Sequence, residues 1–150
     1  MQDFKKEIFN SSHGTDIQCQ KPTEKDKSLI KDYLELRLGK NVELNDFFNL
    51  IREQLPRSIT FESLESTAEI EQALCQLELM SQKYVIVIWK YMEDMDKFDL
   101  KYLIKYWEDI WFSSSDETVC LFFPESIKMI LITHYNVIYT APLSRPMSLS

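Results

Sequence analysis

Three aspartates lie close together in the stretch DMDKFD: Asp94, Asp96 and Asp99. Closely spaced carboxylates are ligands that Ca²⁺ prefers, and a calcium-binding loop places them at fixed positions. Counted from Asp94, the sixth position is Asp99, where the loop requires glycine, and the twelfth is Lys105, where it requires glutamate. The segment therefore fails the calcium template. We predict that Asp99 instead caps a helix that follows it.

Cys120 and His134 form the one thiol and imidazole pair that predicted neighbouring strands could bring together. If a two-residue turn at Glu125 and Ser126 joins the strands, Cys120 lies opposite Leu131, and His134 falls on the other face of the sheet. A nucleophilic thiolate also needs an accessible, electropositive setting, whereas the apolar run TVCLFF predicts burial. The sequence therefore predicts no catalytic dyad here.

Metal and cofactor chemistry find little support elsewhere. His13 and Cys19 lack the two further ligands that a zinc site requires, and the chain has two histidines in all. Gly14 and Gly39 are its two glycines, so no glycine-rich loop can cradle a phosphate. Carboxylate pairs are abundant, but nothing else converges on them. We expect no metal, no cofactor and no catalytic residue; a small enzyme with a carboxylate or cysteine site remains the alternative.

The stretch DIWFSSSDE, residues 109–117, has two interpretations. In the first, Trp111 and Phe112 end a helix and pin it to the sheet, the serines satisfy exposed backbone groups, and Asp116 starts a turn. In the second, the same residues form an exposed acidic and aromatic loop, a mixture typical of small protein interfaces. Both interpretations stay open at this stage.

The charge of the chain is uneven. The net charge is −7, and residues 56–82 hold five glutamates against one cation, Arg57. Such a surface repels nucleic acid and favours a basic protein partner. The simpler interpretation is a solvated helix face that keeps the protein in solution.

Length and composition are those of one globular domain. A chain of 150 residues buries a sizeable core, and we predict a single domain over residues 1–140 with a flexible tail at 141–150, where two prolines interrupt any pattern. Three cysteines without CxxC spacing indicate a reducing compartment. No apolar run reaches the length of a membrane span, so we expect a cytoplasmic protein.

The periodicities predict an α+β fold. Two N-terminal helices are expected, the first with a capping box of Thr23 and Asp26 and a stop at Gly39, the second with Asn45 as N-cap and ending before Pro56. A short strand then precedes a helix capped by Thr67, and a helix capped by Asp99 follows later. The expected strands are SITFESL, the two-sided core strand YVIVIWK, and a closing antiparallel meander of TVCLFF, KMILIT and NVIY.

These elements predict a mixed sheet of about five strands. The two helices after Thr67 and Asp99 are interpreted as crossover connections, which would make the first three strands parallel. The continuous apolar runs of residues 84–89 and 119–123 predict that both faces of the sheet are covered, by helices or by a second subunit.

The segment YWEDIWFSSSDE, followed by TVCLFF and MILITHYNVIY, resembles the closing segment of some bacterial immunity proteins that neutralise polymorphic or contact-dependent toxins. The resemblance covers residues 106–139. Its elements are the helix end at 109–111, the Ser-Ser-Asp of 114–116 and His134 after the second strand. The chain departs from other immunity folds, because it has no glycine-rich signature of the SUKH superfamily and its two-helix start does not match barstar.

The resemblance implies a small, acidic cytoplasmic protein that binds a toxin domain and blocks it without doing chemistry. We therefore predict a non-enzymatic inhibitor whose partner is a cognate protein, a basic toxin domain, with no nucleic acid and no membrane involved. A structural subunit of a homodimer or larger oligomer is a further alternative. The predicted partner-binding residues lie in the glutamate-rich helix and in the stretch that follows residue 110: Glu69, Glu71, Glu78, Trp111, Ser114, Asp116 and Glu117.

Overall fold

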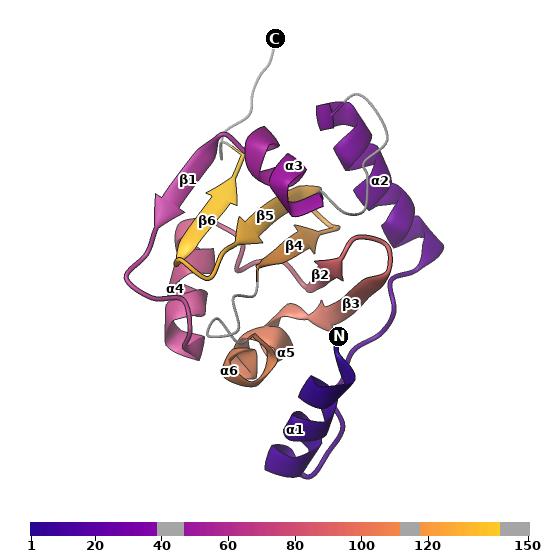
Figure 1. Cartoon of the computed structure of the whole chain (residues 1–150), viewed down its shortest axis with the longest axis vertical. Helices are drawn as coiled ribbons and strands as arrows, with labels where there is room; N and C mark the ends of the chain where they lie inside the picture. Colours follow the sequence, from indigo (N-terminus) through magenta and orange to yellow (C-terminus); the bar gives the residue numbers. More distant parts are fainter. Residues whose placement is uncertain (39–46, 112–117, 142–150) are drawn as a thin grey trace.

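A six-stranded sheet with helices on both faces organises the computed structural model, which describes residues 1–38, 47–111 and 118–141. The described helices are α1 (Asp3–His13), α2 (Glu24–Leu38), α3 (Phe47–Gln54), α4 (Thr67–Gln76), α5 (Leu100–Lys105) and α6 (Trp107–Ile110). The described strands are β1 (Arg57–Thr60), β2 (Tyr84–Lys90), β3 (Asp94–Asp99), β4 (Val119–Phe123), β5 (Lys128–Ile132) and β6 (Val137–Thr140). Figure 1 shows their arrangement.

The strand order is β1-β6-β5-β4-β2-β3, and every neighbouring pair is antiparallel. The prediction of three parallel strands was wrong. It treated the polar segment between β2 and Asp99 as a link, whereas residues 94–99 form β3 and return beside β2 as a hairpin. The helical connections do join strands of the same direction, but these strands are not neighbours: α4 carries the chain from β1 at one edge to β2 near the other.

The predicted closing meander is confirmed. Strands β4, β5 and β6 pair in sequence, with Cys120 opposite Leu131 as expected. The connection between β4 and β5 is longer than the predicted two-residue turn, because Phe123 already pairs with Lys128, but it keeps the same register. His134 lies in the turn after β5 and not on a strand, so the prediction that it occupies the opposite sheet face was wrong.

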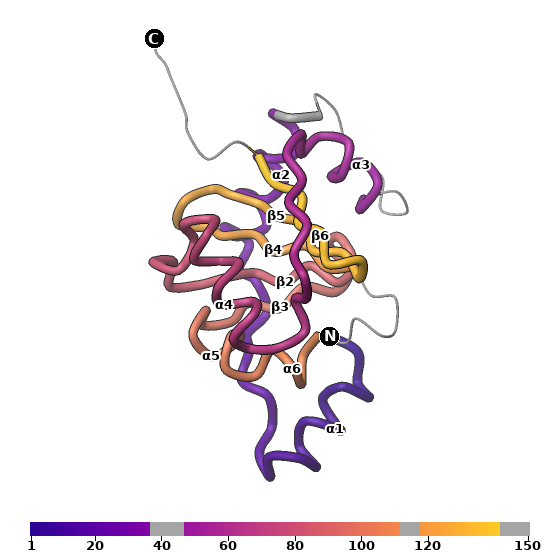
Figure 2. The backbone as a smooth tube through the Cα atoms, turned by 90° about the vertical axis from the view of Figure 1, so that its left-hand side faces the viewer, coloured from indigo at the N-terminus to yellow at the C-terminus, as the bar shows by residue number. Residues whose placement is uncertain are grey.

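Both faces of the sheet are covered, as the apolar runs of β2 and β4 predicted. On one face, Val85 and Val87 belong to a core that includes buried residues of α4, α5 and α6. On the other face, Ile86 and Ile88 pack in a second core with residues of α2 and α3. Figure 2 shows α4 and α5 on one side of the sheet and α3 on the other.

Side-chain caps fix the residues at which several helices begin. Thr23 and Asp26 exchange the predicted pair of hydrogen bonds before α2, at 3.0 and 3.1 Å. Asp99 accepts from the backbone N–H of Lys101 at 3.0 Å and so caps α5, as predicted. The predicted cap of α4 was one residue late, because Ser66 is the N-cap. The predicted stop at Gly39 and cap at Asn45 lie outside the described residues.

A third helix, α1, precedes the two that were predicted. This helix continues through His13 and ends where Gly14, at φ 71°, donates its N–H to the Asn10 carbonyl at 2.7 Å. Figure 1 shows α1 below the rest of the molecule. From Gly14 the chain runs back to the sheet, where Gln20 pairs with Lys97 of β3.

Candidate functional site

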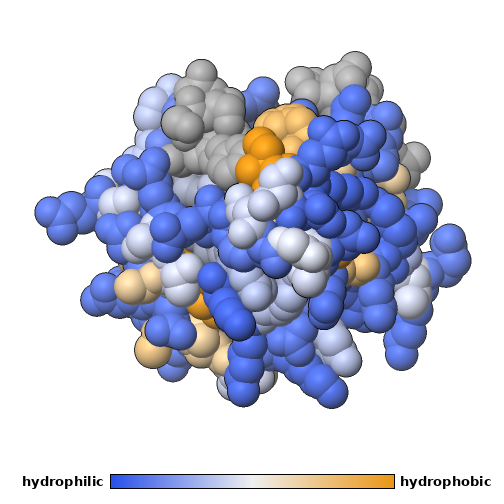
Figure 3. Space-filling model, turned by 90° about the horizontal axis from the view of Figure 1, so that it is seen from below, coloured by the Kyte–Doolittle hydropathy of each residue, from blue (hydrophilic) through white to orange (hydrophobic). Residues whose placement is uncertain are grey.

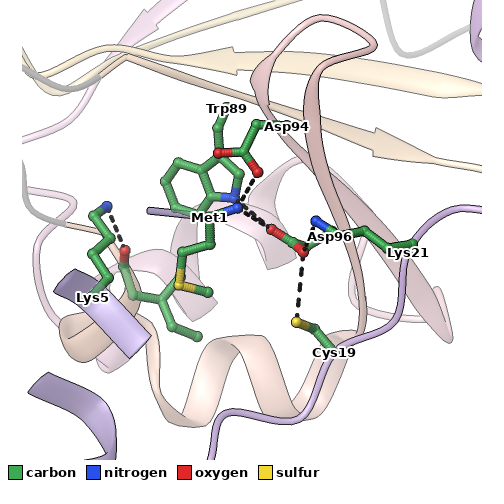
Figure 4. Close-up of polar contacts among 8 residues, drawn as sticks. Met1, Lys5, Cys19, Lys21, Trp89, Asp94 and Asp96 are labelled. Carbon is green, nitrogen blue, oxygen red and sulfur yellow. Dashed lines mark hydrogen bonds and ion pairs between the residues drawn. The ribbon is translucent and has the colours of Figure 1, made fainter. Parts of the chain in front are cut away.

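The most densely connected polar group among the described residues surrounds Asp96 on β3. We call it the Asp96 cluster, and Figure 4 shows it. Its members come from four separate segments of the chain, namely Met1 before α1, Cys19 and Lys21 in the link to α2, Trp89 on β2, and Asp94 and Asp96 on β3.

A bulge in β2 brings the indole of Trp89 to this cluster. The pairing of β2 with β3 shifts between Ile88 and Lys90, which leaves Trp89 as the extra residue. A bulge re-aims a side chain and increases the local twist. Here the Trp89 Nε1–H donates to the Asp96 Oδ2 at 3.1 Å. Because the register places Asp96 opposite Val87, the carboxylate points to the face that α5 and α6 cover.

The Asp96 carboxylate is 1% exposed and is surrounded by donors. The Met1 ammonium lies 2.6 Å from Oδ2, and Lys21 Nζ lies 3.1 Å from Oδ1. Burial by itself raises the pKa of Asp96, but the hydrogen bonds and charges of the Met1 ammonium and Lys21 outweigh it and hold the pKa below its ordinary value. Asp94 forms a second ion pair with the same ammonium. The carboxylate is therefore ionised, and its lone pairs are already used.

The thiol of Cys19 completes the cluster but is unsuited to nucleophilic chemistry. Its Sγ lies 3.7 Å from the Asp96 Oδ1. Burial, followed by the charge of Asp96, raises the pKa of Cys19 to about 11. At neutral pH the group is a thiol that donates weakly to Asp96. The cluster consequently favours a structural role over catalysis.

Lys5 joins this region to α6. It is 1% exposed, donates from Nζ to the Ile110 carbonyl at 2.9 Å, and lies 4.2 Å from the centre of the Trp89 ring. A cation over an aromatic face is attracted by the ring quadrupole. Lys5 therefore ties α1 both to the end of α6 and to the bulge of β2.

A second contact between α1 and α6 lies about two turns further along α1, at His13. His13 Nε2 is 2.9 Å from the Asp109 Oδ2, and its ring contacts Phe9 in a tilted arrangement and Tyr106 edge-on, with centroids 4.5 and 5.0 Å away. These contacts account for the position of α1 beyond the sheet. Figure 3, the view from below, shows a mostly hydrophilic face with apolar atoms in small groups.

Two shallow depressions flank the segment of residues 18–20. One, of about 400 Å³, is lined by Lys6, Asp16, Lys21 and Asp96 among others, and a second, of about 420 Å³, includes Tyr84, Lys97 and Asp99. Cys19 and Gln20 form the wall that both share. In the first depression Lys21 pairs with Asp96, while in the second Lys97 pairs with Asp26 of α2 and Asp99 caps α5. Among the described residues, no group of three or more His, Cys, Asp or Glu side chains is arranged to hold a metal ion.

The cysteine and imidazole of the predicted sheet do not form a reactive pair. Cys120 is fully buried in the core beneath α2 and α3, and burial raises its pKa far above the ordinary value. The register of β4 and β5 confirms the predicted pairing of Cys120 with Leu131. Its thiol is therefore a core group.

The structure describes four of the seven predicted partner-binding residues and places them in three different settings. Glu71 and Glu78 are exposed on and after α4. Glu69 is engaged, because its Oε1 accepts from the Ser66 N–H at 3.1 Å while its own N–H donates to the Ser66 Oγ, and these bonds with Ser66 lower its pKa. Trp111 is 2% exposed and packs against Trp107, which fits the first interpretation of DIWFSSSDE. Ser114, Asp116 and Glu117 lie outside the described residues.

Sequence reasoning missed the Asp96 cluster. Asp94 and Asp96 were considered only as calcium ligands, and Met1, Lys5 and Lys21 lie far from them in sequence. One signal was available: in DMDKFD the apolar residues Met95 and Phe98 would fall on opposite faces of a strand, and a strand covered on both faces would bury the intervening Asp96. A buried carboxylate needs cations, which the lysine-rich start of the chain supplies.

Comparison with protein-family models gives no match, and comparison with curated proteins and with solved structures gives none either. In the described segments, no helix is long and apolar enough to cross a membrane.

Proposed function

We propose that this chain is a non-enzymatic inhibitor that binds a basic protein, as an immunity protein of a bacterial cell binds and neutralises a cognate toxin. The observation that carries the proposal is the charge of one continuous stretch. From residue 58 to residue 82 the chain has no lysine, arginine or histidine, and it has five glutamates. These residues form most of β1, all of α4 and the segments around them.

Most of these glutamates face solvent. Glu62, Glu65, Glu71 and Glu78 are exposed, and Glu69 is occupied by the helix cap. Glu108 adds a further exposed carboxylate beside the start of α4, where it accepts from the Thr67 N–H at 3.2 Å. A cluster of exposed like charges speeds encounter with an oppositely charged protein and fixes its orientation. We name this surface the α4 acidic face and define it by Glu62, Glu65, Glu71, Glu78 and Glu108.

The chemistry of the remaining polar groups supports binding over catalysis. The Asp96 carboxylate is saturated by its donors, and the pKa values of Cys19 and Cys120 are raised, so neither thiol is activated. The immunity assignment itself comes from the resemblance of residues 106–139 and from the acidic character of the chain. Its cytoplasmic location is part of the same proposal.

The test is a charge reversal on the α4 acidic face. The tagged protein is co-expressed with the products of its neighbouring reading frames and purified at low and moderate salt, and the affinity for a stoichiometric basic partner is then measured. We expect Glu71→Lys with Glu78→Lys to lower the association rate about tenfold at low salt, because long-range attraction is lost. The double variant should no longer restore the growth of cells that express the partner.

The matched control carries the same change of charge on the opposite side of the sheet. Glu35 of α2 and Glu53 of α3 are exposed, and replacing both by lysine alters the net charge equally. This control should leave association largely intact. Equal loss in both double variants, or no loss in either, would contradict the placement of the interface on the α4 acidic face.

A further inference from the structure

The two edges of the sheet differ in how they are covered. At the β3 edge, the link between α1 and α2 runs alongside, and Gln20 and Lys97 exchange backbone hydrogen bonds of 3.0 and 2.7 Å. At the other edge, β1 pairs with β6 on its inner side. Within residues 1–38, 47–111 and 118–141, no backbone segment pairs with the outer side of β1.

The register shows which groups of β1 face outward. The Phe61 N–H donates to the Asn136 carbonyl at 2.8 Å, so Phe61 points its backbone groups towards the β6 side. In an antiparallel pair, such residues alternate with residues whose N–H and C=O point away from the partner strand. Ile59, opposite Ile138, therefore points inward like Phe61. Ser58 and Thr60 direct their N–H and C=O groups to the outer side.

The side chains of this edge favour an extended occupant. Ser58 and Thr60 are exposed, and Ile59 is half-buried against the core beneath α4. An added strand could thus place apolar residues beside Ile59 and polar residues beside the hydroxyls. Natural sheets protect such edges by making them short or charged, and β1 is short, at four residues.

The charge around β1 favours one kind of added strand. Glu62 and Glu65 follow β1 directly and are exposed, and they lie on the same stretch as the rest of the α4 acidic face. A second copy of this chain would bring the same carboxylates against one another. A strand that carries lysine or arginine at alternate positions would place cations near these carboxylates and be attracted to them.

We propose that β1 accepts a basic, extended segment of the partner protein as an added antiparallel or parallel strand, hydrogen-bonded to Ser58 and Thr60. This inference deepens the proposed function and rests on it for the charge of the partner. Main-chain hydrogen bonds to the edge of β1 hold the segment in place, and the α4 acidic face orients it.

Proline at position 60 tests the pairing selectively. Because the Thr60 N–H points outward, Thr60→Pro removes a donor of the open edge and leaves the bonds to β6 in place, and proline is tolerated at such positions. Thr60→Ala keeps the N–H and is the matched control. Ser58→Pro is a second variant at the other outward residue, for use if Thr60→Pro perturbs the fold as judged by circular dichroism.

The probe is an eight-residue peptide that alternates lysine and valine, compared with one that alternates glutamate and valine. Amide hydrogen exchange of the full chain is followed by NMR. We expect the lysine peptide to slow exchange at Ser58 and Thr60 at least tenfold, Thr60→Ala to bind it equally, and Thr60→Pro to bind it at least tenfold more weakly. The glutamate peptide should bind at least tenfold more weakly than the lysine peptide.

Several outcomes would overturn the inference. They are protection at residues away from β1, equal binding by Thr60→Pro, equal binding of the two peptides, and no saturation at a peptide concentration of about 1 mM, which corresponds to a very weak complex. Self-association of the wild type that Thr60→Pro abolishes, measured by light scattering, would assign the edge to a second copy and would also overturn it.

The same variants separate this inference from the proposed function. If a purified basic partner binds Thr60→Pro as well as wild type but loses affinity for the Glu71 and Glu78 reversal, the inhibitor proposal stands and the added strand is refuted. If no basic partner exists but the lysine peptide protects Ser58 and Thr60, the edge binds strands and the inhibitor proposal fails.

Discussion

Replacing Asp96 by asparagine tests whether the Asp96 cluster holds the N-terminal segment on the sheet. The substitution keeps the shape of the side chain and removes a charge that is 1% exposed and bound by the Met1 ammonium, Lys21 and the Trp89 indole. Breaking a buried charge pair by changing one partner costs about 3–5 kcal/mol. Since the asparagine oxygen still accepts hydrogen bonds, we expect the lower end, about 3 kcal/mol of unfolding free energy.

For a chain of this length, such a loss lowers the melting temperature by about 6–12 °C. The measurements are urea unfolding and thermal unfolding followed by circular dichroism. Asp94→Asn is the matched control, because Asp94 contacts the same ammonium but its side chain is 27% exposed. It should cost about 1 kcal/mol or less, since an ion pair with one partner open to solvent contributes little.

The pH dependence has a defined sign. The pKa of Asp96 is lower in the folded chain than its ordinary value of 3.8. The stability it contributes is therefore fully present above pH 3.8 and is lost as the pH falls through the lower, folded pKa. The difference between wild type and Asp96→Asn should be constant near neutral pH and shrink in acid. A difference below about 1 kcal/mol at pH 7, equal to that of Asp94→Asn, would refute the reasoning.

Two further predictions concern the α4 cap and the thiols. Ser66→Ala removes the N-cap oxygen that accepts from Glu69 and should lower the unfolding free energy by about 1 kcal/mol in urea, whereas Ser66→Asp should retain most of the stability; equal losses would contradict the capping role. In labelling with a disulfide reagent at pH 8, the exposed Cys75 should react first, Cys19 much more slowly because its pKa is raised to about 11, and the buried Cys120 only on unfolding; Cys19 reacting as fast as Cys75 would disprove its burial against Asp96.

The sequence was most informative where local periodicity decides structure. The two-sided burial of β2 and β4, the closing meander and the caps at Thr23 and Asp99 follow from short-range patterns, and the structure confirms them. Strand β3 was not predicted because its three aspartates and one lysine make the segment polar despite the apolar residues Met95 and Phe98. Without β3, α5 and α6 were assigned to the wrong pair of strands.

The candidate site was harder to predict than the fold. The exposure of Glu71 and Glu78 agrees with the charge pattern of α4, while the capping role of Glu69 follows from Ser66 and had been assigned to Thr67. The Asp96 cluster depends on contacts between residues more than seventy positions apart, and a single sequence carries no signal for such pairs. The bulge at Trp89 is likewise set by pairing with β3 and not by local propensity.

The position of β1 at the sheet edge also has a kinetic consequence. Strands β2 and β3, and likewise β4, β5 and β6, follow one another as hairpins, whereas pairing Arg57 with Thr140 closes a loop on the order of eighty residues, which costs conformational entropy before it gains contacts. We therefore expect β1 to dock late in refolding and to open before the rest of the sheet. A segment that binds on its outer side would slow that opening, so amides of β6, which it never touches, would become protected together with those of Ser58 and Thr60.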